Sequence, residues 1–127
     1  MYCVVTNNPK VANADWKGLE KDFLENGSYL DVLLRVRDYT HKHYSIITHP
    51  LAGSIKPNQI PYRSIVVSDK PYDEEEYLQS CILIENSIET FHKFMSCRPT
   101  PDWPERFLDD FQDADFSLLD GAIQHMI

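Results

Sequence analysis

Short apolar runs rich in β-branched residues predict three buried strands along the chain. These runs are residues 2–6 (YCVVT), 44–48 (YSIIT) and 64–68 (SIVVS), and valine, isoleucine and threonine are enriched in strands. The third run is nearly continuous in apolar residues, which is typical of a central strand buried on both faces. Residues 10–18 are compatible with a single helical turn, and residues 19–27 with either a short strand or a frayed helix.

Two longer segments have the three- and four-residue apolar spacing of amphipathic helices. The first begins at Ser28, whose S-x-x-D spacing to Asp31 is a variant of the capping box, and ends in the basic residues 41–43. The second covers roughly residues 73–95, with acidic residues in its first turn. Three prolines in residues 97–104 break it. The apolar residues that follow predict two short terminal helices.

Strands separated by helices predict an α/β fold. We expect a small, three-layer-like domain over residues 1–96, with a short, mostly parallel sheet and flanking helices. We expect residues 97–127 to form an acidic, proline-broken helical tail that packs on this domain or extends from it. Ligands of open α/β sheets bind beyond the carboxyl ends of the strands. Asn7 and Asn8 follow the first strand and His49 follows the second, so these residues meet at one rim if the two strands are neighbours.

Composition narrows the class of protein. The chain has 127 residues, 43% of them apolar, which is enough for one folded core. No apolar run approaches the roughly 18 to 20 residues that cross a bilayer, and the N-terminal residues do not resemble a secretory signal, so we expect a cytoplasmic protein without a membrane segment. The three cysteines form no C-x-x-C motif, and His41 and His43 are poorly spaced for one metal ion on a helix, so no metal site or other cofactor is expected.

Charge is unevenly distributed along the chain. The formal net charge of −8 argues against nucleic-acid binding. Residues 35–63 nevertheless carry five basic residues against Asp38 alone, whereas residues 102–120 carry seven acidic residues against Arg106 alone. The acidic tail is interpreted as a solvated surface. Alternatively, it docks on a basic partner or on the cationic loop of its own chain.

That cationic loop has the components of an anion site. Lys56 supplies a point charge, Arg63 a planar fork that suits carboxylates and phosphates, and Gly53–Ser54 offers backbone N–H groups and a hydroxyl. Three prolines limit the flexibility of the loop, so little entropy is lost on binding. We expect a small anion or phosphorylated metabolite here, and an ordinary rigid loop is the alternative. The candidate anion-binding residues are Asn7, Asn8, His49, Gly53, Ser54, Lys56, Asn58, Tyr62 and Arg63.

His49 is the best candidate for a catalytic acid or base, because an unperturbed imidazole titrates near neutral pH. The loop holds no acidic residue that would orient it. The chain also lacks the phosphate-binding P-loop, the glycine-rich dinucleotide fingerprint and the G-x-S-x-G elbow of serine hydrolases. The sequence therefore leans towards binding rather than catalysis.

Three segments together resemble the GrdX family. They are VVTNNP at residues 4–9, GSYLDVLLRVRD at 27–38 and THPLAGSIKPNQIPYRSIVVS at 48–68. The resemblance covers roughly residues 1–95 and does not include the tail after Cys97. Proteins of this family are encoded beside glycine, sarcosine and betaine reductase genes. The resemblance therefore implies an accessory role in the reductive deamination of amino acids, in the cytoplasm, and it implies no catalytic residue.

The sequence and the resemblance together lead to one expectation and two alternatives. We expect an accessory or regulatory binding protein of the glycine and betaine reductase system, with a reductase subunit as a possible partner and a small anion held by the loop at residues 48–63. One alternative is a small enzyme that acts on an acyl or phosphoryl compound, with His49 as acid or base. The other is a pure interaction module that docks through the helix at 73–95 or through the acidic tail. The apolar stripe of that helix also fits a homodimer.

Overall fold

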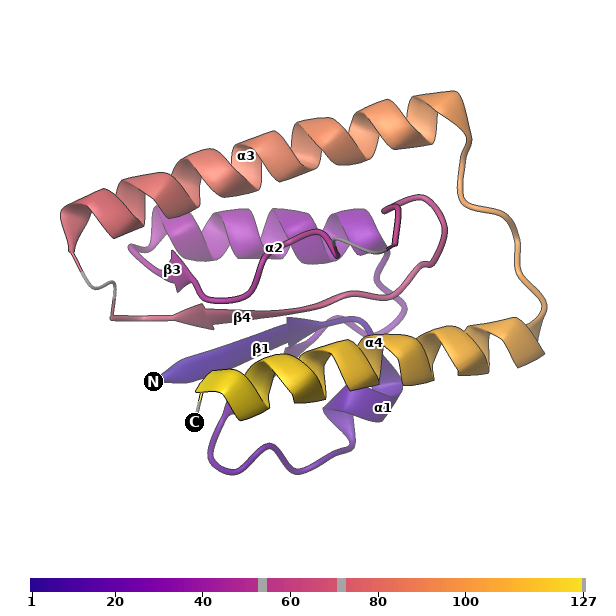
Figure 1. The fold of residues 1–127 in the computed structure, drawn as a ribbon, viewed down its shortest axis with the longest axis horizontal. Helices are drawn as coiled ribbons and strands as arrows, with labels where there is room; N and C mark the ends of the chain where they lie inside the picture. Colours follow the sequence, from indigo (N-terminus) through magenta and orange to yellow (C-terminus); the bar gives the residue numbers. More distant parts are fainter. Residues whose placement is uncertain (53–54, 71–72, 127) are drawn as a thin grey trace.

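The computed structural model describes residues 1–52, 55–70 and 73–126 of the chain. Four strands and four helices follow one another in the described residues (Figure 1). In chain order they are β1 (Tyr2–Thr6), α1 (Pro9–Ala12), β2 (Glu20–Phe23), α2 (Tyr29–His41), β3 (Ser45–Ile46), β4 (Ser64–Ser68), α3 (Glu74–Cys97) and α4 (Glu105–Met126).

The strands form one mixed sheet in the order β2-β1-β4-β3. The expected α/β class is confirmed, but the sheet is mixed rather than mostly parallel, because β1 and β2 form the one parallel pair among the described strands. β4 is antiparallel to both β1 and β3. The reason is the connection from β3 to β4, in which the described residues contain no helix. The chain therefore turns back beside β3 instead of crossing over to a parallel position.

Helices cover both faces of the sheet (Figure 1). On one face, Val5 of β1 and Val67 of β4 pack against α2 and α3. On the other face, Val4 and Val66 pack with residues of α1 and α4. All five residues of β4 are buried, which agrees with the central strand expected from its unbroken apolar run.

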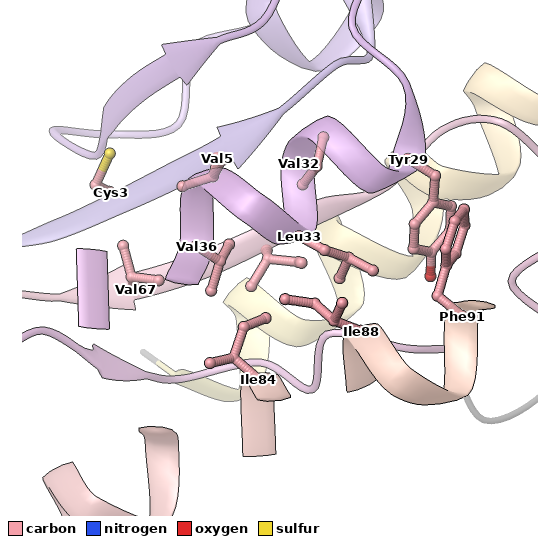
Figure 2. Packing of buried hydrophobic residues seen from close by; sticks show 11 residues of the cluster. Cys3, Val5, Tyr29, Val32, Leu33, Val36, Val67, Ile84, Ile88 and Phe91 are labelled. Atoms are coloured by element: carbon pink, nitrogen blue, oxygen red, sulfur yellow. The ribbon is translucent and has the colours of Figure 1, made fainter. Parts of the chain in front are cut away.

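The larger core lies between the sheet, α2 and α3. Leu33 of α2 and Ile88 of α3 point toward one another (Figure 2). Tyr29 and Phe91 stack at the end of this layer with ring centroids 5.5 Å apart. Burying each side chain of this size contributes about 1.5–3 kcal/mol to folding. This layer holds the carboxyl end of α3 beside the loop that precedes β4.

The ends of the two long predicted helices agree closely with their sequence signals. Ser28 Oγ accepts a hydrogen bond from Asp31 N at 3.0 Å, and Asp31 Oδ2 accepts one from Ser28 N at 2.8 Å, so the capping box is complete. Asp73 caps α3, which continues two residues past the expected end. The ambiguous segment at 19–27 contains the edge strand β2.

The tail is one helix rather than the two that were predicted. α4 is continuous from Glu105 to Met126 because no proline interrupts it and because Asp115, Leu119 and Ile123 share one buried face at four-residue spacing. The apolar pattern is broken at Asp115. The helix continues through this residue because its carboxylate accepts hydrogen bonds from Asn8 and Ser64 and lies near the guanidinium of Arg63. Among the described residues, no helix combines the length and apolar character needed to cross a membrane.

Candidate functional site

A buried carboxylate of the tail lies at the ends of β1 and β4. Asp115 is only 1% exposed. Its Oδ1 accepts a hydrogen bond from Ser64 N at 3.0 Å, and its Oδ2 accepts bonds from Ser64 Oγ at 2.7 Å and Asn8 Nδ2 at 3.0 Å. Arg63 Nη1 lies 3.9 Å from Oδ1. We call these four residues, Asn8, Arg63, Ser64 and Asp115, the Asp115 network.

Arg63 is occupied by contacts within the protein. Its Nε donates to the carbonyl of Pro50 at 3.1 Å and its Nη2 donates to the carbonyl of His49 at 2.6 Å. Its backbone N–H donates to Asn7 Oδ1 at 3.0 Å. The guanidinium therefore ties the start of the loop to β4 and balances the charge of Asp115, and little of its hydrogen-bonding capacity remains for a ligand.

The two asparagines and Tyr62 also have structural partners. Asn7 Nδ2 donates to the carbonyls of Gly27 at 3.0 Å and Pro61 at 2.8 Å. Asn8 caps α1 through its Oδ1 and donates to the carbonyl of Gln112 at 2.8 Å. Tyr62 Oη accepts a hydrogen bond from Gln112 Nε2 at 2.9 Å. These three candidate residues hold the strand ends and α4 together.

Tyr29 lies beside this network and is strongly affected by its burial. Its hydroxyl donates to the carbonyl of Pro50 at 3.3 Å, the same carbonyl that Arg63 contacts. Burial raises the pKa of Tyr29 to about 12, although the positive charge of Arg63 acts in the opposite direction. The phenol therefore stays protonated as a donor throughout the physiological pH range.

His49 is exposed and lines a cleft between the loop and α4. His49 Nδ1 lies 3.0 Å from Leu51 N and 2.9 Å from the carbonyl oxygen of Leu51, and the tautomer of the ring decides which of the two it bonds. The cleft has a volume of about 450 Å³ and is lined by the loop, the start of β4 and the last turns of α4, including His125. No carboxylate of the described residues forms an ion pair or a hydrogen bond with the His49 ring.

Lys56 and Asn58 line a different cleft, which we call the Lys56 cleft. It has a volume of about 460 Å³, and its lining residues are Lys56, Asn58, Gln59, Phe94, Cys97, Arg98, Pro101 and Trp103. Asn58 Nδ2 donates to the carbonyls of Phe94 at 3.3 Å and Arg98 at 2.8 Å, and so caps the carboxyl end of α3. Trp103 Nε1 donates to the carbonyl of Gln59 at 2.9 Å. These bonds fix both walls of the cleft.

The structure therefore divides the candidate residues among several places. Lys56 and Arg63 line one common cavity, but its volume is about 10 Å³, which suits at most one water molecule. Asn7 and Tyr62 line another cleft, together with Gly27 and Pro61. Gly53 and Ser54 lie outside the described residues.

Two cations in the Lys56 cleft have no charged partner in the part of the chain that the structure describes. Lys56 and Arg98 are both exposed, and neither makes an ion pair with any residue that the structure describes. By contrast, Lys10 binds Asp109 and Asp113, two members of the exposed acidic cluster on α4. The sequence analysis missed Arg98 and Trp103. The three prolines around them were a signal of a fixed linker, but not of its position beside Lys56.

A model of the family described as GrdX-like protein matches residues 3–124. The match includes the loop, the Asp115 network and nearly all of α4, so the family resemblance extends well beyond residue 95 and includes the tail. No curated protein and no solved structure matches the chain. Because the match spans almost the whole sequence, the chain belongs to the family of GrdX-like proteins.

Proposed function

We propose that this protein is an accessory binding protein of the glycine reductase system and that it holds a small anion in the Lys56 cleft. Membership of the GrdX-like family supports the association with that system at the level of the family. The protein acts in the cytoplasm, beside the reductase subunits. Its ligand is a carboxylate or a phosphorylated metabolite of this metabolism.

The observation that carries the proposal is a pair of cations in one cleft that form no ion pair with any of residues 1–52, 55–70 and 73–126. Lys56 and Arg98 line the same cavity in a protein with a net charge of −8. A guanidinium binds carboxylates and phosphates through two parallel hydrogen bonds, and an ammonium adds a compact charge. Arg63, in contrast, is neutralised by Asp115 and bonded to two carbonyls. The loop therefore offers its anion site at Lys56 rather than at Arg63.

The walls of the cleft support the proposal because they are held in place without a ligand. Asn58 joins the loop to the end of α3, and Trp103 joins it to the linker between α3 and α4. Pro57 is buried between these two anchors. A site that is already ordered loses little conformational entropy when it binds.

Thermal unfolding at constant ionic strength tests the anion site. Acetate, phosphate and acetyl phosphate are each compared with chloride for the wild type, for the double variant Lys56→Met/Arg98→Met, and for Lys70→Met. Lys70 is a suitable control because it is exposed and makes no ion pair with a described residue. A ligand at about one hundred times its dissociation constant adds about 2.7 kcal/mol of stability, which raises the midpoint by several degrees in a domain of this size.

We expect at least one anion to raise the midpoint of the wild type and of Lys70→Met but not of the double variant. If no anion raises the midpoint of the wild type, the anion site is wrong. The same conclusion follows if Lys70→Met loses the response to the same extent, because the effect then reflects net charge alone.

A protein-interaction module is the second candidate function. Leu78 and Ile82 lie one turn apart on α3 and are 52% and 61% exposed. Apolar side chains with this exposure and spacing fit the surface of a partner protein. Size-exclusion chromatography with each purified reductase subunit tests this function. Complex formation that is lost in Leu78→Lys/Ile82→Lys and kept in Lys56→Met/Arg98→Met would favour the module over the anion site.

A further inference from the structure

The Lys56 cleft contains groups that suit positive as well as negative charge. Lys56 and Arg98 provide the cationic part. The carboxyl end of α3 lies in the same cleft, where Phe94 and Cys97 belong to its last turn. The exposed carbonyls of a helix end carry a partial negative charge and favour cations. A simple anion would use only the first of these two parts.

Asn58 adds a hydrogen-bond acceptor to the second part. The residue is 8% exposed, and its Nδ2 is fully used by the carbonyls of Phe94 and Arg98. Its Oδ1 is buried and has no hydrogen-bond partner among the described residues. A buried acceptor without a donor is costly, so a ligand N–H group gains a favourable bond if the side chain or the cleft wall yields enough to admit it to this oxygen.

Trp103 contributes an aromatic side chain in a fixed position. Its Nε1 is bonded to the loop, and its ring packs edge-on against Phe107 and Phe111, with centroid distances of 5.6 and 5.2 Å. Phe94 lines the same cleft. The faces of such rings attract ammonium groups. The cleft therefore has two parts. The two cations suit a negatively charged group, and the aromatic rings with the amide acceptor suit a positively charged one.

We infer that the ligand of the Lys56 cleft is a small amino-acid zwitterion. Its carboxylate lies at Lys56 and Arg98, and its ammonium group donates to Asn58 Oδ1 near the end of α3 and the ring of Trp103. This inference rests on the proposed anion site and specifies its ligand. The volume of about 460 Å³ accommodates a small molecule of this kind.

Titration of the ¹⁵N-labelled full chain by NMR tests this inference with four probes at constant pH and ionic strength. Glycine carries both charged groups. Acetate lacks the nitrogen, glycolate replaces the ammonium by a hydroxyl, and trimethylglycine keeps the positive charge without an N–H donor. The indole signal of Trp103 and the side-chain amide signal of Asn58 report on the cleft. Trp16, the second tryptophan, is buried in the other core layer and serves as an internal control.

We expect glycine to bind at least about tenfold more tightly than acetate, glycolate or trimethylglycine, and to shift the signals of Trp103 and Asn58 but not that of Trp16. Lys56→Met/Arg98→Met loses the binding of glycine and acetate alike. Equal affinities for acetate and glycine would overturn the zwitterion while leaving the anion site intact. Equal affinities for trimethylglycine and glycine would overturn the hydrogen bond to Asn58. If none of the four probes binds, the zwitterion is overturned together with a carboxylate site.

Discussion

The Asp115 network and the Lys56 cleft use similar residues for different purposes. Each contains an arginine and an asparagine, and both lie along the loop that precedes β4. In the network, the chain supplies its own carboxylate, and every charged group is buried and bonded. In the cleft, no described carboxylate reaches the two cations, which stay exposed. A cation in a loop therefore indicates an anion-binding site only when its ion-pair and hydrogen-bond partners within the protein are known.

The largest expected effect is the loss of stability in Asp115→Ala. This change leaves the Arg63 charge and the Asn8 and Ser64 donors buried without their acceptor, and breaking a buried charge pair costs about 3–5 kcal/mol. Urea unfolding followed by circular dichroism measures this cost. Asp110→Ala is the matched control, because Asp110 is exposed on the same helix, and we expect it to change stability by less than about 0.5 kcal/mol. A cost below about 1 kcal/mol for Asp115→Ala would show that the network does not secure α4.

The second-largest expected effect is a loss of folding stability at alkaline pH. The pKa of Tyr29 is raised to about 12 by burial, whereas an unfolded tyrosine titrates near pH 10. Between pH 10 and pH 12, Tyr29 therefore keeps its hydroxyl proton in the folded state and loses it in the unfolded state. The stability contribution is complete below pH 10 and is lost as the pH rises to 12, by about 2–3 kcal/mol. Urea unfolding between pH 9 and 12 should show this loss in the wild type and a smaller one in Tyr29→Phe. Parallel pH profiles for the two proteins would contradict the assignment to Tyr29.

The smallest effect on stability is expected in the Lys56 cleft. Lys56→Met/Arg98→Met should change the free energy of unfolding by less than about 1 kcal/mol, because exposed charges near a helix end contribute little. Arg63→Met, which removes a buried cation, should cost about 3 kcal/mol or more because it leaves Asp115 unpaired. Urea unfolding of both variants measures the difference. Equal costs would mean that the cations of the cleft are structural too, and the comparison between the two regions would fail.

The local pattern of the sequence was sufficient for most of the secondary structure. The apolar run of β4, the capping box of α2 and the stripe of α3 each depend on residues a few positions apart, and the structure confirms all three. The direction of β4 was not predictable in this way, because it depends on how a loop of many residues folds back. The length of α4 was missed for a related reason: its break in apolar pattern, Asp115, is compensated by residues more than fifty positions away.

The candidate site was predicted only in part. The acids of the tail differ in their position relative to Leu119 and Ile123, and Asp115 alone precedes them by four and eight residues, on the buried face. That spacing was an available signal for an internal partner of the loop. The neighbourhood of Lys56 and Arg98 gave no such signal. Lys56 and Arg98 are brought together because α3 is long enough for its last turn to reach the loop, where Asn58 bonds to it. The packing of the core sets the position of α3, and this packing cannot be deduced from residues close in sequence.

The position of α4 has a consequence for how the protein is made. One face of β1 and β4 is covered by the final helix of the sequence, with Leu119 and Ile123 packed near Val4 and Val66. On the ribosome, α2 and α3 emerge first and can close over their own face of the sheet, whereas the part of the opposite face that α4 covers stays bare until α4 has left the exit tunnel. Between the emergence of β4 and that of α4, the nascent chain therefore carries an exposed apolar surface on its sheet.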